Sequence, residues 1–157
     1  YSDIVFEQKI IQQMLEITDG IRLAVDLDWK KHYQNRTMHT LSEAENVLVE
    51  NGRILQIRKN IPKSSQNQQI GEFLGIMTLS SEHVKILLDR YSYLKNNHRG
   101  TFHNSSSLSN AYITDMLQEI INYGINVNPV FTQGRWCEID TPEDLKNAEK
   151  LINKLQS

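Results

Sequence analysis

Residues 136–145 read Trp-Cys-Glu-Ile-Asp-Thr-Pro-Glu-Asp-Leu and join a short extended run to the start of a helix. The helix start is visible because Thr141 suits the N-cap, Pro142 suits the first helical position, and acids follow in the first turn. Glu138 and Asp140 lie at the end of the extended run, where a rigid junction can hold a carboxylate still enough to ligate a metal. The stretch therefore predicts a strand–helix unit that presents acids to a ligand.

Outward from this junction, extended and helical patterns alternate along the chain. We expect helices over residues 6–17, 81–95, 110–123 and 142–155. We expect strands over residues 21–25, 70–79 and 125–131. Asn51-Gly52, between two apolar runs, is a strong hairpin signal, and no strand is expected before the first helix. We expect one α/β domain over 1–157: a mixed, mostly parallel sheet flanked by helices, with one β-hairpin.

Composition narrows the class of protein. The 157 residues are 39% hydrophobic and 23% charged, as in a globular domain, and the formal net charge of −2 argues against a nucleic-acid partner. No apolar run approaches the roughly 18 residues that a membrane helix needs, so no membrane partner is expected. The single Cys137 excludes an internal disulfide and, with no signal peptide visible, favours a cytoplasmic location.

Asp3, near the other end of the chain, is the natural partner for Asp140. We expect each of these acids to lie at the carboxyl end of a strand, where open α/β sheets bind ligands. Mg²⁺ fits such a pair, because it commonly takes one or two carboxylates and completes its octahedron with waters and substrate phosphates. The alternative is that both acids only cap helices.

Two further groups of acids are candidates for substrate contact. Asp26 and Asp28 follow a buried strand as Asp-Leu-Asp, a spacing similar to the metal-binding pair of nucleotide-sugar glycosyltransferases; a solvated strand end is the alternative. Glu72 lies between Gly71 and Gly75 inside a predicted strand. Because interior glycines weaken a sheet unless a backbone or ligand approaches closely, Glu72 is a candidate ligand contact, or else a solvent-facing acid at a bulge.

Lys59, which follows Arg58 at the end of the predicted hairpin, is a candidate clamp for an anionic substrate. An exposed charge at a hairpin end is an equally good interpretation. The histidines and Cys137 lack zinc-binding spacing, and no nucleophile motif appears.

Five segments, in this order, carry a resemblance to a known family. They are residues 1–6 (Tyr-Ser-Asp-Ile-Val-Phe), 25–29 (Val-Asp-Leu-Asp-Trp), 71–76 (Gly-Glu-Phe-Leu-Gly-Ile), 111–117 (Ala-Tyr-Ile-Thr-Asp-Met-Leu) and 136–145. Together they resemble the later two-thirds of the nucleotidyltransferases that build NDP-sugars and CDP-alcohols. The similarity is greatest to the cytidylyltransferase-like branch linked to phosphoenolpyruvate mutase and phosphonate metabolism, and it covers almost the whole chain.

The resemblance implies a Rossmann-like nucleotidyltransferase fold with one Mg²⁺ site. Asp3 matches the family's first metal aspartate and Asp140 its second, which makes both catalytic. Glu72 matches an acceptor-site acid, and Lys59 matches a basic residue near the acceptor's phosphate or phosphonate.

The same resemblance places Asp26 and Asp28 in the acceptor pocket, where acids suit a cationic amine. Glu138, at the end of the extended run, is also expected to bind substrate. The reaction it implies is nucleotidyl transfer from a nucleoside triphosphate, CTP being favoured, to a small anionic acceptor, with release of pyrophosphate. A glycosyltransferase using Asp26 and Asp28, and a non-catalytic binding or dimerisation fragment, are the alternatives.

One element of the family is absent. Nothing in the chain resembles the Gly-rich loop, Leu-Ala-Ala-Gly-x-Gly-x-Arg-Leu, that holds the triphosphate. The resemblance therefore implies an N-terminally truncated domain, inactive alone, that associates with itself or with the missing N-terminal segment.

Overall fold

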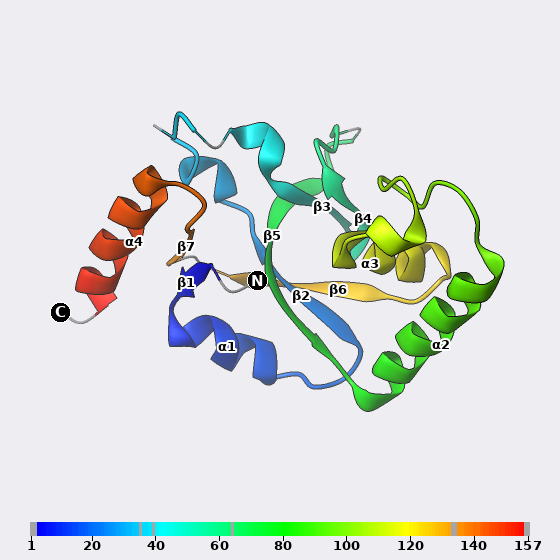
Figure 1. Ribbon diagram of the computed structural model, residues 1–157. Helices are drawn as coiled ribbons and strands as arrows, with labels where there is room; N and C mark the ends of the chain where they lie inside the picture. The colour runs from blue at the N-terminus through cyan, green and yellow to red at the C-terminus, as the bar shows by residue number, and fades with distance from the viewer. Residues whose placement is uncertain (1–2, 35, 39, 64, 133–134, 156–157) are drawn as a thin grey trace.

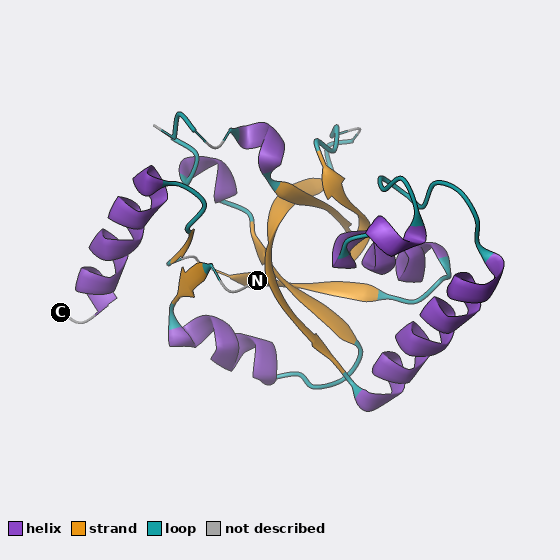
Figure 2. Ribbon diagram, in the orientation of Figure 1, coloured by secondary structure: helices purple, strands orange, loops and turns teal. Residues whose placement is uncertain are grey.

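The computed structural model describes residues 3–34, 36–38, 40–63, 65–132 and 135–155 (Figure 1). Its strands are β1 (Ile4–Phe6), β2 (Ile21–Asp26), β3 (Glu45–Glu50), β4 (Arg53–Lys59), β5 (Gln69–Leu79), β6 (Val127–Thr132) and β7 (Trp136–Glu138). Its α-helices are α1 (Gln8–Leu15), α2 (Ser81–Asn97), α3 (Ile113–Asn122) and α4 (Pro142–Leu155), with short 3₁₀ helices η1 (Trp29–Lys31), η2 (Leu41–Glu43) and η3 (Leu108–Asn110). Figure 2 shows the helices around a curved central sheet.

The main sheet has the strand order β4-β3-β5-β2-β6, and β1 pairs with β7 in a separate two-stranded ribbon. Among the described strands, only β2 and β6 pair in parallel. The expected mixed sheet and hairpin are confirmed, but the expectation of a mostly parallel sheet is wrong. Parallel neighbours need a crossover, whereas β3 and β4 are joined by the tight turn at Asn51-Gly52 and β5 returns antiparallel to both β3 and β2.

The sheet is covered on both faces, as its side-chain alternation requires. Ile21, Leu23 and Val25 of β2 belong to the core cluster that packs against α3, whereas Ala24 belongs to a second cluster on the α1 side. Trp136 of β7 joins the second cluster, so the ribbon is fixed against the main sheet. The expected α/β layering is thus confirmed.

Two boundaries differ from expectation for local reasons. The first helix begins at Gln8 because β1 precedes it, and the pairing partner that makes β1 a strand lies in β7. Helix α3 begins at Ile113, since the Asp115 carboxylate accepts the N–H of Tyr112 at 3.0 Å and closes the first turn. Within the residues that the structure describes, no helix combines the length and apolar character needed to span a bilayer.

Strand β5, the central strand of the main sheet, bends midway where its pairing with β2 is irregular. The register with β2 shifts between Leu23 and Val25, and Gly75, inside the shift, has φ 73°. This left-handed conformation at a strand irregularity is that of a glycine bulge, which bends and twists the strand (Figure 1).

Gly71 is needed because β2 approaches closely. A Cβ at this position would lie 2.3 Å from Cγ1 of buried Val25 and 3.0 Å from the backbone oxygen of Asp26. We therefore expect Gly71→Ala to lower the free energy of unfolding by about 2 kcal/mol, since neither neighbour can yield easily. Urea denaturation measures this, with exposed Gln69→Ala as the control on the same strand; equal stability of the two variants would contradict it.

Candidate functional site

The ribbon of β1 and β7 brings the beginning of the described chain beside the segment that precedes α4. Ile4 lies opposite Glu138 in the antiparallel register, and the Ile139 N–H donates to the Asp3 backbone oxygen at 2.7 Å. Asp3, before β1, and Asp140, after β7, therefore lie at the same end of the ribbon. The expectation that each acid follows a strand is right for Asp140 but wrong for Asp3, which precedes its strand. Tyr1 and Ser2, part of the first quoted segment, lie outside the described residues.

A cavity of about 750 Å³ opens beside this end of the ribbon. Its lining includes five of the seven candidate site residues, namely Asp3, Lys59, Glu72, Glu138 and Asp140. These side chains come from both ends of the chain and from two strands of the main sheet. Segments up to 137 residues apart in sequence (3 to 140) thus meet in one cavity.

The carboxyl groups at this end of the ribbon affect one another's ionisation. Burial, reinforced by the neighbouring carboxylates of Asp140 and Asp3, raises the pKa of Glu138 to about 7. A hydrogen bond between Glu138 and Asp140 acts in the same direction, which is the behaviour of carboxyl groups that share a proton. A cation would relieve the same repulsion, and carboxylate oxygens are the ligands that Mg²⁺ prefers.

Asp3 and Asp140 themselves are exposed, so an ion can reach them. Within the described parts of the chain, no group of three or more His, Cys, Asp or Glu side chains is arranged to hold a metal. Two carboxylates are a donor set that Mg²⁺ accepts, since it commonly takes one or two of them and completes its coordination with water and substrate phosphates.

Glu72 lies buried against the cavity, with a residue exposure of 3%. Burial raises the pKa of its carboxyl to about 8, although a hydrogen bond from the Tyr33 hydroxyl to Oε1 opposes the shift. Its Oε2 has no hydrogen-bond partner among the described residues, and neither has Nδ2 of Asn46, the residue opposite it on β3. The two unpartnered atoms lie on the same face of the sheet, and of these two residues Glu72 lines the cavity, where a ligand can meet it.

Lys59 and Arg58 line the cavity, together with the acids Glu43 and Glu45. The Lys59 ammonium donates to Glu43 Oε2 at 2.8 Å, and this hydrogen bond raises the pKa of Lys59. Both side chains of the pair are about half exposed, so the ammonium can exchange this partner for an anionic ligand.

Asp26 and Asp28 do not line this cavity. Asp26 is 1% exposed and accepts from Trp136 Nε1 at 2.9 Å, and its Oδ2 lies 3.1 Å from His32 Nε2. Burial opposes ionisation, but the hydrogen bonds from His32 and Trp136 keep the pKa of Asp26 below its usual value. Asp26 thus fastens β2 to β7, while Asp28 makes an exposed ion pair with Lys31. This placement does not support assigning either acid to the acceptor pocket.

The two acids of the Asp-Leu-Asp sequence should respond differently to the same change. Asp26→Asn removes a buried charge from three donors, namely His32, Trp136 and the Asp28 N–H, so we expect the free energy of unfolding at pH 7 to fall by about 2 kcal/mol or more. Asp28→Asn is the matched control and should change it by less than about 0.5 kcal/mol, because the Lys31 pair is exposed. Urea denaturation checks both, and similar small effects would show that the Asp26 contacts do not stabilise the fold.

The start of α4 confirms the capping prediction made from residues 141–144. The Asp144 carboxylate accepts the Thr141 N–H at 3.0 Å, and the Asp144 N–H donates to Thr141 Oγ1 at 3.3 Å. Sequence reasoning missed Tyr33 and Arg36, which lie in the connection between β2 and β3 and contact Glu72 and Asp144, respectively. No local pattern singles out these two residues.

The chain is similar to known proteins in sequence and in fold. No family model matches the chain. Over 147 residues the chain is 28% identical to a CTP:phosphoglutamine cytidylyltransferase of Campylobacter jejuni, covering 93% of this chain and 56% of that protein.

Two solved structures share the fold. The inositol-1-phosphate CTP transferase of T. maritima superposes with a TM-score of 0.62 at 21% identity, over 99% of this chain and 54% of that one. A Bacillus anthracis protein assigned as a glucose-1-phosphate thymidylyltransferase gives 0.57 at 17% identity, over 95% and 51%. The chain thus spans about half the length of these relatives. The resemblance seen in the sequence is confirmed: the chain is similar in sequence to a cytidylyltransferase and has the Rossmann-like mixed α/β fold of nucleotidyltransferases.

Proposed function

We propose that this chain forms the metal- and acceptor-binding part of a nucleotidyltransferase. The intact protein would transfer a nucleotidyl group from a nucleoside triphosphate to a phosphate- or phosphonate-bearing acceptor and release pyrophosphate. The observation that carries the proposal is the convergence of Asp3, Glu138, Asp140 and Glu72 on one cavity. CTP is the favoured donor, because two of the relatives are CTP-dependent by name.

The charge of each residue decides its proposed role. Asp3 and Asp140 would hold Mg²⁺, which when bound offsets the negative charge of the phosphates. Arg58 and Lys59, which also line the cavity, would attract the acceptor's phosphate or phosphonate group. Glu72, which holds a proton at neutral pH, would hydrogen-bond the rest of the acceptor through its unpartnered Oε2.

The chemistry needs no dedicated base. The acceptor oxygen is already anionic near neutral pH, so it can attack the α-phosphorus in line. The bond that forms joins this oxygen to the α-phosphorus, and the bond that breaks joins the α-phosphorus to the bridging oxygen of the departing pyrophosphate. The role of the side chains is therefore positioning and charge compensation.

Product analysis tests the proposal in the intact protein. With CTP, Mg²⁺ and a panel of phosphate- and phosphonate-bearing acceptors, we expect pyrophosphate and a cytidylylated product in equal amounts, detected by phosphorus NMR. CTP with a methylene group between the α- and β-phosphorus should give neither product, since the bond to be broken is absent.

Other outcomes would support the alternatives. Release of a nucleoside diphosphate from a nucleotide sugar would favour the glycosyltransferase, although Asp26 and Asp28 lie outside the cavity. No turnover even with an upstream nucleotide-binding segment would favour the non-catalytic fragment. Self-association, or association with such a segment, and a cytoplasmic location belong to the proposal, and light scattering tests the first.

A further inference from the structure

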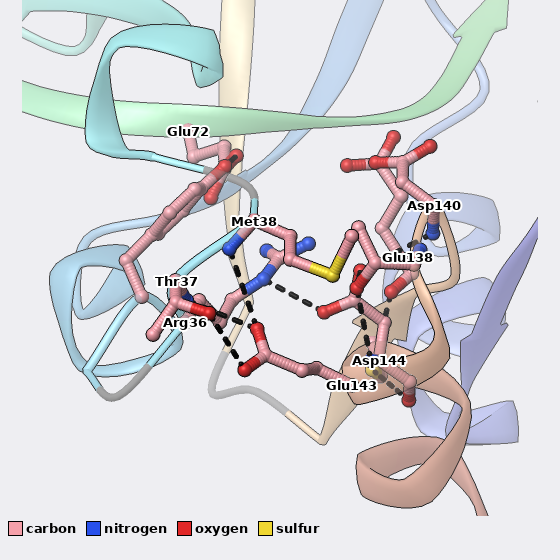
Figure 3. Close-up of polar contacts among 11 residues, drawn as sticks. Arg36, Thr37, Met38, Glu72, Glu138, Asp140, Glu143 and Asp144 are labelled. Atoms are coloured by element: carbon pink, nitrogen blue, oxygen red, sulfur yellow. Dashed lines mark hydrogen bonds and ion pairs between the residues drawn. The ribbon is translucent and has the colours of Figure 1, made fainter.

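A three-residue segment, Arg36 to Met38, docks onto the start of α4 (Figure 3). We refer to residues 36–38 as the strap. The Thr37 N–H and hydroxyl donate to the two carboxylate oxygens of Glu143, each at 2.9 Å, and the Met38 N–H donates to the same carboxylate at 3.4 Å. More than a hundred residues of sequence separate the strap from Glu143, so these contacts exist only in the folded chain.

Arg36 makes the buried contact of the strap. Its Nε lies 2.8 Å from Asp144 Oδ1, and the two side chains are 6% and 1% exposed. The other oxygen of Asp144 accepts the N–H of Asp140 at 3.3 Å, as well as the N–H and the hydroxyl of Thr141 at 3.0 and 2.8 Å. One carboxylate therefore connects Arg36 to the turn that carries Asp140.

Arg36 also reaches toward the acceptor side of the site. Its guanidinium carbon lies 4.9 Å from the centroid of the Tyr33 ring, and the Tyr33 hydroxyl donates to Glu72. Its Nη2 is buried with no hydrogen-bond partner in the described part of the chain. The buried Arg36 guanidinium thus contacts both Asp144, which binds the turn that carries Asp140, and Tyr33, which binds Glu72.

We propose that Arg36 is a positioning residue for both acids. Through Asp144 it holds the turn that directs Asp140 toward Asp3, and through the Tyr33 ring it holds Glu72 at the cavity. The inference rests on the proposed function, because Asp140 is a metal ligand only there. A purely structural role for Arg36 would affect stability without a specific effect on the turn.

Metal binding and amide exchange together separate these possibilities. Arg36→Met keeps an unbranched side chain out to the position of Nε but removes the charged guanidinium. We therefore expect Mn²⁺ affinity, followed by electron paramagnetic resonance, to fall about tenfold. Hydrogen exchange at the Asp140 and Thr141 amides in the metal-free protein should accelerate about tenfold more than exchange in β3. Arg36→Lys, which can still pair with Asp144, should recover most of both losses.

Thr37→Val is the matched control, because it loses the hydroxyl contact with Glu143 but leaves Arg36 and Asp144 untouched. It should change Mn²⁺ affinity and exchange at the turn by less than about twofold. If Arg36→Met does not fold, Asp144→Asn should show the same two losses, since the ion pair is shared. In either case, the double variant Arg36→Lys with Asp144→Asn should lose no more Mn²⁺ affinity, and exchange no faster at the turn, than Asp144→Asn alone.

Wild-type Mn²⁺ affinity and exchange in Arg36→Met would overturn the proposal. Equal losses in Thr37→Val would do the same, because they would show that any weakening of the strap suffices. Should the wild-type protein bind no Mn²⁺, the proposed metal role fails, whereas the exchange rates of the turn still decide whether Arg36 positions it.

Discussion

Asp140→Asn in the intact protein should reduce the rate of pyrophosphate release by about a hundredfold or more, an effect typical of removing charge stabilisation from a transition state. The substitution keeps the size of the side chain and one oxygen, but it removes half of the proposed metal-binding pair. Asp140 lies just before the N-terminal end of α4, which Asp144 caps. An asparagine at this position can keep the hydrogen bond from its backbone N–H to the Asp144 carboxylate. The loss should therefore appear in kcat with little change in stability.

The control for this experiment lies on the same helix. Glu149 is exposed on α4 and does not line the cavity, so Glu149→Gln should retain activity within about twofold. Steady-state assays of pyrophosphate release with CTP and acceptor measure both variants. Unchanged activity in Asp140→Asn would remove Asp140 from the metal site. Loss of activity in Asp28→Asn instead would favour the glycosyltransferase interpretation.

Glu72→Gln should stabilise the protein at neutral pH. Burial raises the pKa of the folded-state carboxyl to about 8 from the ordinary value of 4.5. Between these values the folded state holds a proton that the unfolded state has released, so the acid makes folding less favourable as the pH rises from 4.5 toward 8. At pH 7 the penalty is about 3 kcal/mol, and a neutral glutamine that still accepts from Tyr33 avoids it.

The sign of this effect depends on pH. Urea denaturation should show a gain in stability for Glu72→Gln at pH 7 and none at pH 4.5, where the native carboxyl is already protonated. Activity should move in the other direction, with a higher KM for the acceptor. Equal loss of stability at both pH values would mean that Glu72 is held as a paired carboxylate.

Elements with a strong local signal were predictable from the sequence. The turn at Asn51-Gly52 specified the hairpin, and Thr141 with Asp144 specified the start of α4. The three residues of β1 carry no such signal, because they form a strand only by pairing with β7. The predicted strand directions were wrong for a related reason. Alternating strands and helices suggest crossover connections and parallel pairing, whereas short connections between neighbouring strands give antiparallel pairing.

Some residues of the candidate site were also predictable from the sequence, and others were not. The acids at the ribbon end and Glu72 were visible as carboxylates at strand ends or between glycines, and the fold brings them to one cavity. Asp26 looks the same in sequence, yet its partners His32 and Trp136 are fixed by tertiary structure and keep it out of that cavity. Arg36 could not be identified, since only the folded chain places it against Asp144.

The position of a bound ion decides whether Asp3 and Asp140 act together. Crystals of the intact protein with Mn²⁺ and the methylene analogue of CTP can be measured at the manganese absorption edge. We expect one anomalous peak about 2.2 Å from a carboxylate oxygen of each aspartate, with phosphate oxygens completing the coordination. A peak beside Asp28 or Asp26, or none at saturating Mn²⁺, would show that the two acids do not share a cation.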